Sequence, residues 1–282
     1  MKSEKITSTA NPKIKELRSL MEKPREREGK GLFVTEGVRE TLHCLDAGFV
    51  PRAVFHSPEI SGDGLGKILS AIKENRHLSA ASERLCIFEV SPEVYSRIAY
   101  REGTEGIVAE VHAKKPMRLD DLRMDVPKTG KEPLVAVIEN VEKPGNIGAI
   151  LRSAEGCGAD ALIVCGKGCD IYNPNLIRAS IGAVFRIPVV TCTTTEAIDW
   201  LKKNGILIYT AQLQDSETYY DTDLSRGCAI VLGSEDKGLG NEWRKAADGH
   251  IRIPMLGRLD SLNVSVSAGI LLYEALRQRM TR

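Results

Sequence analysis

The sequence lacks the features that would place it in several large protein classes. No apolar run approaches the ~18 residues of a membrane-spanning helix, and the opening MKSEKITSTANPK contains no signal-peptide core. Seven cysteines occur without paired CxxC spacing and five histidines are scattered, so no metal site is expected. The formal net charge of +1 is compatible with RNA or any other partner. We expect a soluble cytoplasmic enzyme in a reducing compartment, with most cysteines in the core.

The chain is long enough for two domains. Its 282 residues allow each of two domains to bury a core. The stretch KKPMRLDDLRMDVPKTGKEP, residues 114–133, is rich in Lys, Asp and Pro and has little apolar periodicity, as is typical of a linker. The sequence therefore predicts a first domain of residues 1–113, a linker of 114–132 and a second domain of 133–282.

Strand-like and helix-like segments alternate after residue 133. Strands are expected at 134–138, 161–165, 186–190, 206–210, 228–232 and 250–253, with helices between them that include 195–204 and 241–247. This alternation predicts an α/β domain with a mostly parallel sheet. A dinucleotide-binding Rossmann domain fits poorly, because Gly156-Cys157-Gly158 precedes a strand and no GxGxxG opens a helix.

A first polar turn, VEKPGNIGAILRSAEGCGAD, follows the apolar run at 134–138. Asn146 can cap a helix, and the helix has one apolar face made of Ile147, Ile150, Leu151 and Ala154. Arg152 lies off that face, and a cation near a helix N-terminus opposes the helix dipole. Arg152 is therefore not placed for helix stability, although an ordinary solvated arginine is the simplest alternative.

Two further polar turns follow strand-like runs. The glycine-rich GSEDKGLGNEW contains Glu235, and Gly233, Gly238 and Gly240 permit positive φ or close backbone approach. The third stretch, IRIPMLGRLDSLNVSVSAG, joins a strand at 251–253 to an apolar helix through Ser261 and Asn263. Either residue is explained equally well as a plain N-cap. Each turn by itself is weak support for a functional site.

Together the three turns resemble the signature motifs of the SpoU/TrmH-type RNA 2′-O-ribose methyltransferases of the SPOUT superfamily. The matching text is NIGAILRSAE, VLGSEDKGL, and IRIPM with SLNVSVSAG, in the family's order. Two departures are mild: EKPGN stands where many relatives have an Asp-Pro pair, and Ser153 where threonine is frequent. The resemblance implies an α/β fold in which a C-terminal SPOUT α/β-knot, a parallel sheet with a trefoil knot, follows a small L30e-like α/β domain.

The resemblance also implies a cofactor and site residues. S-adenosyl-L-methionine is the expected methyl donor, held by backbone groups at Gly233, Ile253 and Leu262. No metal is required. The family's catalytic and other polar motif positions fall on Asn146, Arg152, Glu235, Ser261 and Asn263. Because a guanidinium stays protonated, we interpret Arg152 as binding the phosphate beside the target ribose. Asn146 and Ser261 would orient the 2′-hydroxyl.

The N-terminal third resembles the L30e-like substrate-binding domain of ribosomal-RNA members of the family. Residues 1–30 hold nine basic and five acidic side chains, a local charge of +4 that attracts a phosphate backbone. Asn11-Pro12 can start a helix with Ile14, Leu17 and Met21 facing inward. By the resemblance, the expected RNA contacts are Lys13, Lys15, Arg18, Arg25, Arg27 and Arg39. A solvated helix face is the alternative.

The sequence thus predicts S-adenosylmethionine-dependent 2′-O-ribose methylation of RNA, specifically large-subunit rRNA. Three alternatives stay open: a tRNA 2′-O-ribose methyltransferase, a non-catalytic RNA-binding protein, and a nicotinamide-dependent enzyme. The apolar side of the predicted helix 263–278 consists of Val264, Ala268, Leu271, Leu272, Ala275 and Leu276. An intramolecular core explains this stripe, but the resemblance implies a homodimer through the same helix.

Overall fold

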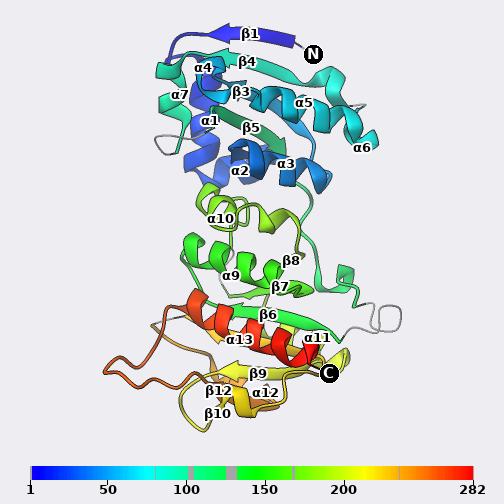
Figure 1. Ribbon diagram of the computed structural model, residues 1–282, viewed down its shortest axis with the longest axis vertical. Coiled ribbons are helices and arrows are strands. Elements are labelled where there is room, and N and C mark those ends of the chain that lie inside the picture. Colours follow the sequence, from blue (N-terminus) through cyan, green and yellow to red (C-terminus); the bar gives the residue numbers. More distant parts are fainter. Residues whose placement is uncertain are drawn as a thin grey trace. The chain divides into compact units, whose positions relative to one another are not determined.

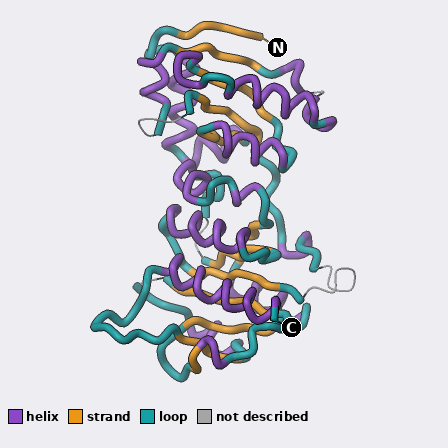
Figure 2. Tube along the Cα trace, in the orientation of Figure 1, coloured by secondary structure: helices purple, strands orange, loops and turns teal. Residues whose placement is uncertain are grey.

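The computed structural model describes residues 2–79, 81–100, 105–124, 132–166, 169–234 and 236–281 (Figures 1 and 2). The chain divides into two compact units. The first unit consists of Met1–Lys115 together with Asp170–Arg186, and the second consists of Pro116–Cys169 together with Ile187–Arg282. The chain therefore passes between the units three times, and each unit is built from two separate parts of the sequence.

The first unit is built on a five-stranded mixed sheet with the order β1-β4-β3-β5-β2. Its strands are β1 (Lys2–Ile6), β2 (Leu32–Glu36), β3 (Pro51–His56), β4 (Cys86–Val90) and β5 (Ile107–His112). Strand β5 is antiparallel to β2 and β3, whereas β4 is parallel to β1 and β3. The helices are α1 (Pro12–Glu22), α2 (Pro24–Lys30), α3 (Val38–Asp46), α4 (Pro58–Ser61), α5 (Gly64–Glu74), α6 (Arg76–Ser79) and α7 (Pro92–Ile98), and a 3₁₀ turn covers Ala81–Arg84.

Helix α1 forms as its sequence predicts. Asn11 is the N-cap, its side chain accepting a hydrogen bond from the backbone N–H of Lys13 at 2.9 Å, and Pro12 takes the first helical position. Ile14 and Leu17 are fully buried in the core beneath β2 and β3. The remaining positions of the helix face carry the basic side chains outward, so the expected amphipathic helix is confirmed.

Residues 170–186 complete the core of the first unit. They contain α10 (Pro174–Ala179) and a 3₁₀ turn at Ala183–Phe185. Tyr172 stacks on Phe33 with ring centroids 4.4 Å apart, and Phe185 meets Phe49 edge-on at 5.2 Å. Aromatic pairs at such distances add to the hydrophobic gain from burying the rings. A segment distant in sequence therefore packs against β2, the edge strand of the first unit's sheet.

A buried ion pair fastens the same segment. Arg27, only 3% exposed, donates from Nε to Oδ2 of Asp170 at 3.0 Å, and a second guanidinium nitrogen also contacts that oxygen. Further guanidinium bonds reach the carbonyls of Leu20 and Met21 at the end of α1. The guanidinium thus ties α2, the end of α1 and Asp170 together.

The second unit contains a seven-stranded sheet with the order β10-β12-β9-β11-β6-β7-β8, parallel throughout. The strands are β6 (Leu134–Glu139), β7 (Ala161–Cys165), β8 (Val189–Cys192), β9 (Leu207–Ala211), β10 (Glu217–Thr218), β11 (Cys228–Gly233) and β12 (Gly249–Arg252). Both faces of its central strands are buried, which accounts for their continuous apolar sequences.

Helices cover the two faces of this sheet. Helices α9 (Pro144–Gly156) and α13 (Val264–Met280) pack against each other and against β6, β7 and β11 (Figure 1). On the other face, α11 (Thr194–Lys203) and α12 (Asn241–Ala246) cover a core that includes Trp200 and Trp243. Short 3₁₀ turns lie at Leu119–Asp121 and Tyr219–Asp221. No helix in the described ranges is long and apolar enough to cross a membrane.

Two local predictions differ from the structure. The strand expected at 186–190 begins at Val189, because residues up to Arg186 pack in the first unit and Pro188 has no N–H for a ladder. Asn146 is not an N-cap: Pro144 takes the first helical position of α9, which places Asn146 inside its first turn. The other predicted strands and helices of the second unit are confirmed to within about two residues.

Removal of the buried cation tests the ion pair. Arg27→Met should lower the free energy of unfolding by about 3 kcal/mol, because Asp170 and the α1 carbonyls lose their charged donor. Arg25→Met, at an exposed position of the same helix, should change it by less than about 0.5 kcal/mol. Urea unfolding followed by circular dichroism measures both. Equal stability of the two variants would contradict the role given to Arg27.

Candidate active site

The first and third polar turns meet where α9 and α13 begin. Asn146, in the first turn of α9, accepts a hydrogen bond at 3.2 Å from Nδ2 of Asn263. Asn263 is the N-cap of α13, and its Oδ1 accepts from the backbone N–H of Ser265 at 3.0 Å and from the Ser265 hydroxyl at 2.6 Å. Of the two residues for which an N-cap was the alternative explanation, Asn263 is the one that caps a helix, and the cap also orients the amide that holds Asn146.

Arg152 lies on the exposed side of α9. Its neighbours on the helix, Ile150, Leu151 and Ala154, are fully buried, whereas Arg152 itself is exposed. The apolar stripe therefore fixes the rotation of α9 and leaves this guanidinium facing solvent on the helix that carries Asn146. An exposed guanidinium can form two parallel hydrogen bonds to a phosphate.

The second turn is a tight backbone loop at the end of β11. A Cβ at Gly233 would lie 2.2 Å from the carbonyl carbon of Gly238, and Gly238 has φ +63°. The N–H of Gly238 donates to the carbonyl of Ser234 at 2.9 Å. At Gly233 only glycine fits without displacing the backbone, and at Gly238 the left-handed φ favours glycine. Glu235 lies outside the described residues.

The third turn, residues 253–263, borders a cavity of about 490 Å³. The cavity is lined by Leu213, Arg252, Ile253, Pro254, Met255, Gly257, Arg258, Leu259 and Asp260. Ile253 and Leu262 are half-buried, whereas Ser261 is exposed and its hydroxyl donates to Asp260 at 3.4 Å. The structure thus brings Asn146 and Asn263 into contact and places Ile253 at a cavity. The Ser261 hydroxyl makes its hydrogen bond within its own loop.

Glu139, a residue that the sequence analysis did not select, joins the second turn to the sheet. It is the last residue of β6 and only 6% exposed. Its Oε2 accepts from the backbone N–H of Gly240 at 2.7 Å, and its Oε1 accepts from the Thr194 hydroxyl at 2.6 Å. The signal in the sequence was an acidic side chain closing the apolar run LVAVI, since a buried carboxylate requires donors.

A second polar cavity of about 430 Å³ opens beside Glu139. Residues Thr193–Thr195 and Gly240–Glu242 line the rest of it. Thr193 caps α11 in a capping box, in which Glu196 accepts from the Thr193 backbone N–H at 2.8 Å. That hydrogen bond lowers the pKa of Glu196. The cavity is therefore framed by ordered carboxylates and hydroxyls.

The predicted RNA contacts lie in the first unit, and one of them is corrected. Lys15, Arg18 and Arg25 are exposed, and Lys13 is partly exposed beside Glu4 at 2.9 Å. Such surface pairs are weak and can exchange for phosphate contacts. Arg27 was wrong as an RNA contact, because its guanidinium is buried against Asp170 and backbone carbonyls.

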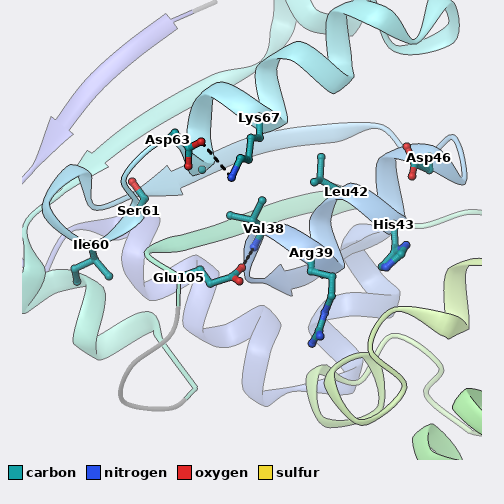
Figure 3. Close-up of a pocket in the computed structure, with 11 residues that line it drawn as sticks. Val38, Arg39, Leu42, His43, Asp46, Ile60, Ser61, Asp63, Lys67 and Glu105 are labelled. Carbon is teal, nitrogen blue, oxygen red and sulfur yellow. Dashed lines mark hydrogen bonds and ion pairs between the residues drawn. The ribbon is translucent and has the colours of Figure 1, made fainter.

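Arg39 borders a separate cavity of about 580 Å³ in the first unit. Figure 3 shows Val38, at the start of α3, donating its backbone N–H to Glu105, and an ion pair between Lys67 and Asp63 at 3.1 Å. Arg39 itself contacts Glu40 at 2.7 Å and keeps an exposed side chain. The rim of this cavity therefore carries both signs of charge.

Comparison with known families covers both units. Residues 133–273 match the model of the SpoU rRNA Methylase family, and residues 11–109 match an MRM3-like substrate binding domain. The chain belongs to the SpoU rRNA methylase family.

Relatives in this family match over most of their length. A 23S rRNA (uridine(2479)-2′-O)-methyltransferase of Streptomyces viridochromogenes is 29% identical over 98% of this chain and 93% of its own. A 23S rRNA (guanosine-2′-O-)-methyltransferase of Xanthomonas axonopodis is 31% identical over 81% of this chain and 94% of its own. Both relatives are described as methylating ribose in 23S rRNA, at different bases.

Solved structures extend the likeness to the fold. An RNA 2′-O ribose methyltransferase superposes with a TM-score of 0.78 at 34% identity, covering 98% of this chain and all of that one. An AdoMet-bound rRNA methyltransferase from Sinorhizobium meliloti superposes with a TM-score of 0.83 at 27% identity, covering 98% of each chain. The α/β fold with a preceding substrate-binding domain is therefore the fold of SpoU methyltransferases.

Gly233 offers a direct test of the second turn. Gly233→Ala should lower the free energy of unfolding by about 1–3 kcal/mol, because the added methyl overlaps the backbone of Gly238. Gly257→Ala, where nothing lies within 4 Å of the new Cβ, is the matched control. Thermal or urea unfolding compares the two variants, and a stability loss at 257 as large as at 233 would contradict the argument.

Proposed function

We propose that this chain transfers the methyl group of S-adenosyl-L-methionine to a ribose 2′-hydroxyl of large-subunit rRNA. Membership of the SpoU rRNA methylase family and the near full-length likeness to 23S rRNA 2′-O-methyltransferases support this activity. The observation that carries it is the contact of Asn146 with Asn263, which joins two distant motifs in one polar site. The matched substrate-binding domain at residues 11–109 favours rRNA over tRNA.

The cofactor would be held by the second and third turns. The cavity of about 490 Å³ beside Ile253 falls within the usual range for small-molecule sites, and its lining combines apolar with charged residues. Gly233, Ile253 and Leu262 are the proposed binding residues. The bound cofactor supplies an electrophilic methyl group on a sulfonium. The predicted trefoil knot stays part of this proposal.

The polar residues then align and activate the ribose. Asn146, held by Asn263, orients the 2′-hydroxyl together with Ser261. Arg152 binds the adjacent phosphate and hydrogen-bonds the 2′-oxygen as negative charge develops there, since its guanidinium is a permanent donor. Glu235 stays a proposed member of the site. Alignment of this kind supplies up to ~7–11 kcal/mol in favourable reactions, so no metal is needed.

The first unit would dock the RNA. Lys13, Lys15, Arg18, Arg25 and Arg39 remain the proposed contacts, and Arg27 is excluded because it is buried. Their charges would neutralise phosphates, so binding should weaken as salt rises. Because ribosomal RNA is the proposed substrate, we expect the protein to act in the cytoplasm.

Arg152→Ala separates chemistry from cofactor binding. Methyl transfer by the natural protein and by the variant is measured with methyl-labelled S-adenosylmethionine and unmodified total RNA. The rRNA and tRNA are then separated and digested to nucleosides. We expect 2′-O-methyl label in large-subunit rRNA with the natural protein, and at least about a 100-fold loss with the variant. Calorimetric affinity for S-adenosylmethionine should persist in the variant.

Three results would contradict parts of this proposal. Label in tRNA would keep the chemistry and overturn the substrate. Absence of label from both RNAs and from isolated ribosomal particles would overturn the methyltransferase activity. Full turnover by Arg152→Ala would overturn the role of that residue alone.

A homodimer through α13 is also proposed. Val266, Tyr273 and Met280 recur every seven residues on α13, so they form one stripe, and they are 50%, 49% and 77% exposed. This stripe is separate from the buried side formed by Ala268, Leu271 and Leu272. Exposed apolar stripes rimmed by polar residues are typical of protein–protein interfaces.

Light scattering tests the dimer. The natural chain should elute with twice the mass of one chain, and Tyr273→Glu should give a monomer, because a charge would be buried at the interface. Lys202→Glu, on α11 at the other face of the sheet, should remain dimeric. A monomeric natural chain at micromolar concentration would contradict the proposal.

A further inference from the structure

Two cysteines end neighbouring strands of the second unit. Cys165 is the last residue of β7, Cys192 is the last residue of β8, and the two are direct partners in the parallel register. Adjacent strands lie ~4.8 Å apart. Disulfides span Cα separations of roughly 4.4–6.8 Å. The backbone therefore already holds these two residues at a separation that a disulfide can bridge.

The side chains also share one face of the sheet. Cys165 and Cys192 both pack against the core under α11, whose other members include Ile163, Val190 and Trp200. The Cys165 thiol donates to the carbonyl oxygen of Thr193, the residue after Cys192, at 3.9 Å. Both Cβ atoms thus point to the same side, as a bridge requires.

The two thiols differ in accessibility and acidity. Cys165 is 1% exposed, whereas Cys192 is half-buried at the end of its strand. The interaction with the neighbouring Cys165 thiol lowers the pKa of Cys192, whereas the same interaction, together with burial, raises the pKa of Cys165. Because the thiolate is the reactive form, Cys192 is the sulfur that an oxidant in solution would meet first.

We propose that Cys165 and Cys192 form a dithiol oxidation site that closes to a reversible disulfide with a low-molecular-weight disulfide such as oxidised glutathione. The Cys192 thiolate attacks one glutathione sulfur, and the S–S bond breaks to release one glutathione thiolate. That thiolate takes the proton of Cys165. The Cys165 sulfur then attacks Cys192 and displaces the second glutathione. Two protein thiols are oxidised, and one disulfide is reduced to two thiols.

The disulfide would close a loop that begins at Cys165 and ends at Cys192. Between the two cysteines the chain includes residues 170–186, which pack in the first unit. The chain leaves the sheet of the second unit after Cys165, at the end of β7, and re-enters it as β8, which ends at Cys192. In that sheet they share one register row with Gly233 and Glu139. Oxidation would therefore cross-link the sheet in the row that carries the second polar turn.

Peptide mass mapping tests the site on the full chain. Reduced protein is equilibrated with mixtures of oxidised and reduced glutathione, quenched in acid, alkylated and digested without reduction. We expect one linked peptide pair, containing Cys165 and Cys192, with two fewer alkylated thiols per chain. Excess reduced glutathione should restore both thiols. Cysteines elsewhere, such as the partly exposed Cys86 of the first unit, should stay alkylated.

Matched variants make the outcome decisive. Cys192→Ser should abolish the linked pair and leave Cys165 alkylated after denaturation, whereas Cys86→Ser should leave the pair unchanged. Cys165→Ala should stop the reaction at a mixed disulfide on Cys192. A linked pair that involves Cys169 instead, a stable mixed disulfide on Cys192 in the natural chain, or two thiols that stay reduced under all mixtures would each overturn the proposal.

Discussion

The buried carboxylate of Glu139 is the contact on which the geometry of the second unit most depends. It closes strand β6, immediately before the segment that carries Asn146 and Arg152. Its two oxygens accept hydrogen bonds from Gly240, in the turn after β11, and from Thr194, at the start of α11. A buried charge is tolerated only when donors satisfy it. Three chain segments distant in sequence are therefore positioned by one side chain.

The parallel sheet brings the three motifs to the same edge as the Glu139 contact. All seven strands of the second unit run the same way, so the turns that follow them emerge at one edge. Gly233 is paired in register with Glu139, and Asn263 reaches Asn146 across the start of α13. The three motifs are separated by many residues, yet the strand order places β11 beside β6. Which motifs lie close together is therefore decided by the strand order in the sheet more than by their spacing in the sequence.

Local chemistry was readable from the sequence, whereas long-range pairing was not. Apolar periodicity predicted the buried side of α9, and Asn11-Pro12 predicted the start of α1, because each depends on neighbouring residues. Arg27 failed as an RNA contact because its partner, Asp170, lies 143 positions away. Glu139 was passed over for the same reason, since both its donors come from other segments. The polar site, by contrast, was found through motifs rather than geometry.

The segment 170–186 shows why sequence similarity and compact structure divide this chain differently. The SpoU match runs from 133 to 273 without interruption, yet Tyr172 and Phe185 belong to the aromatic core of the first unit with Phe33 and Phe49. Without that segment, Phe33 would lose its stacked ring and Arg27 its carboxylate. The core of the first unit is therefore completed only by residues 170–186, which lie within the range that matches the SpoU family. Because the segment 170–186 lies between β7 and β8 in the chain, folding of the first unit is linked covalently to the strands on either side of that segment.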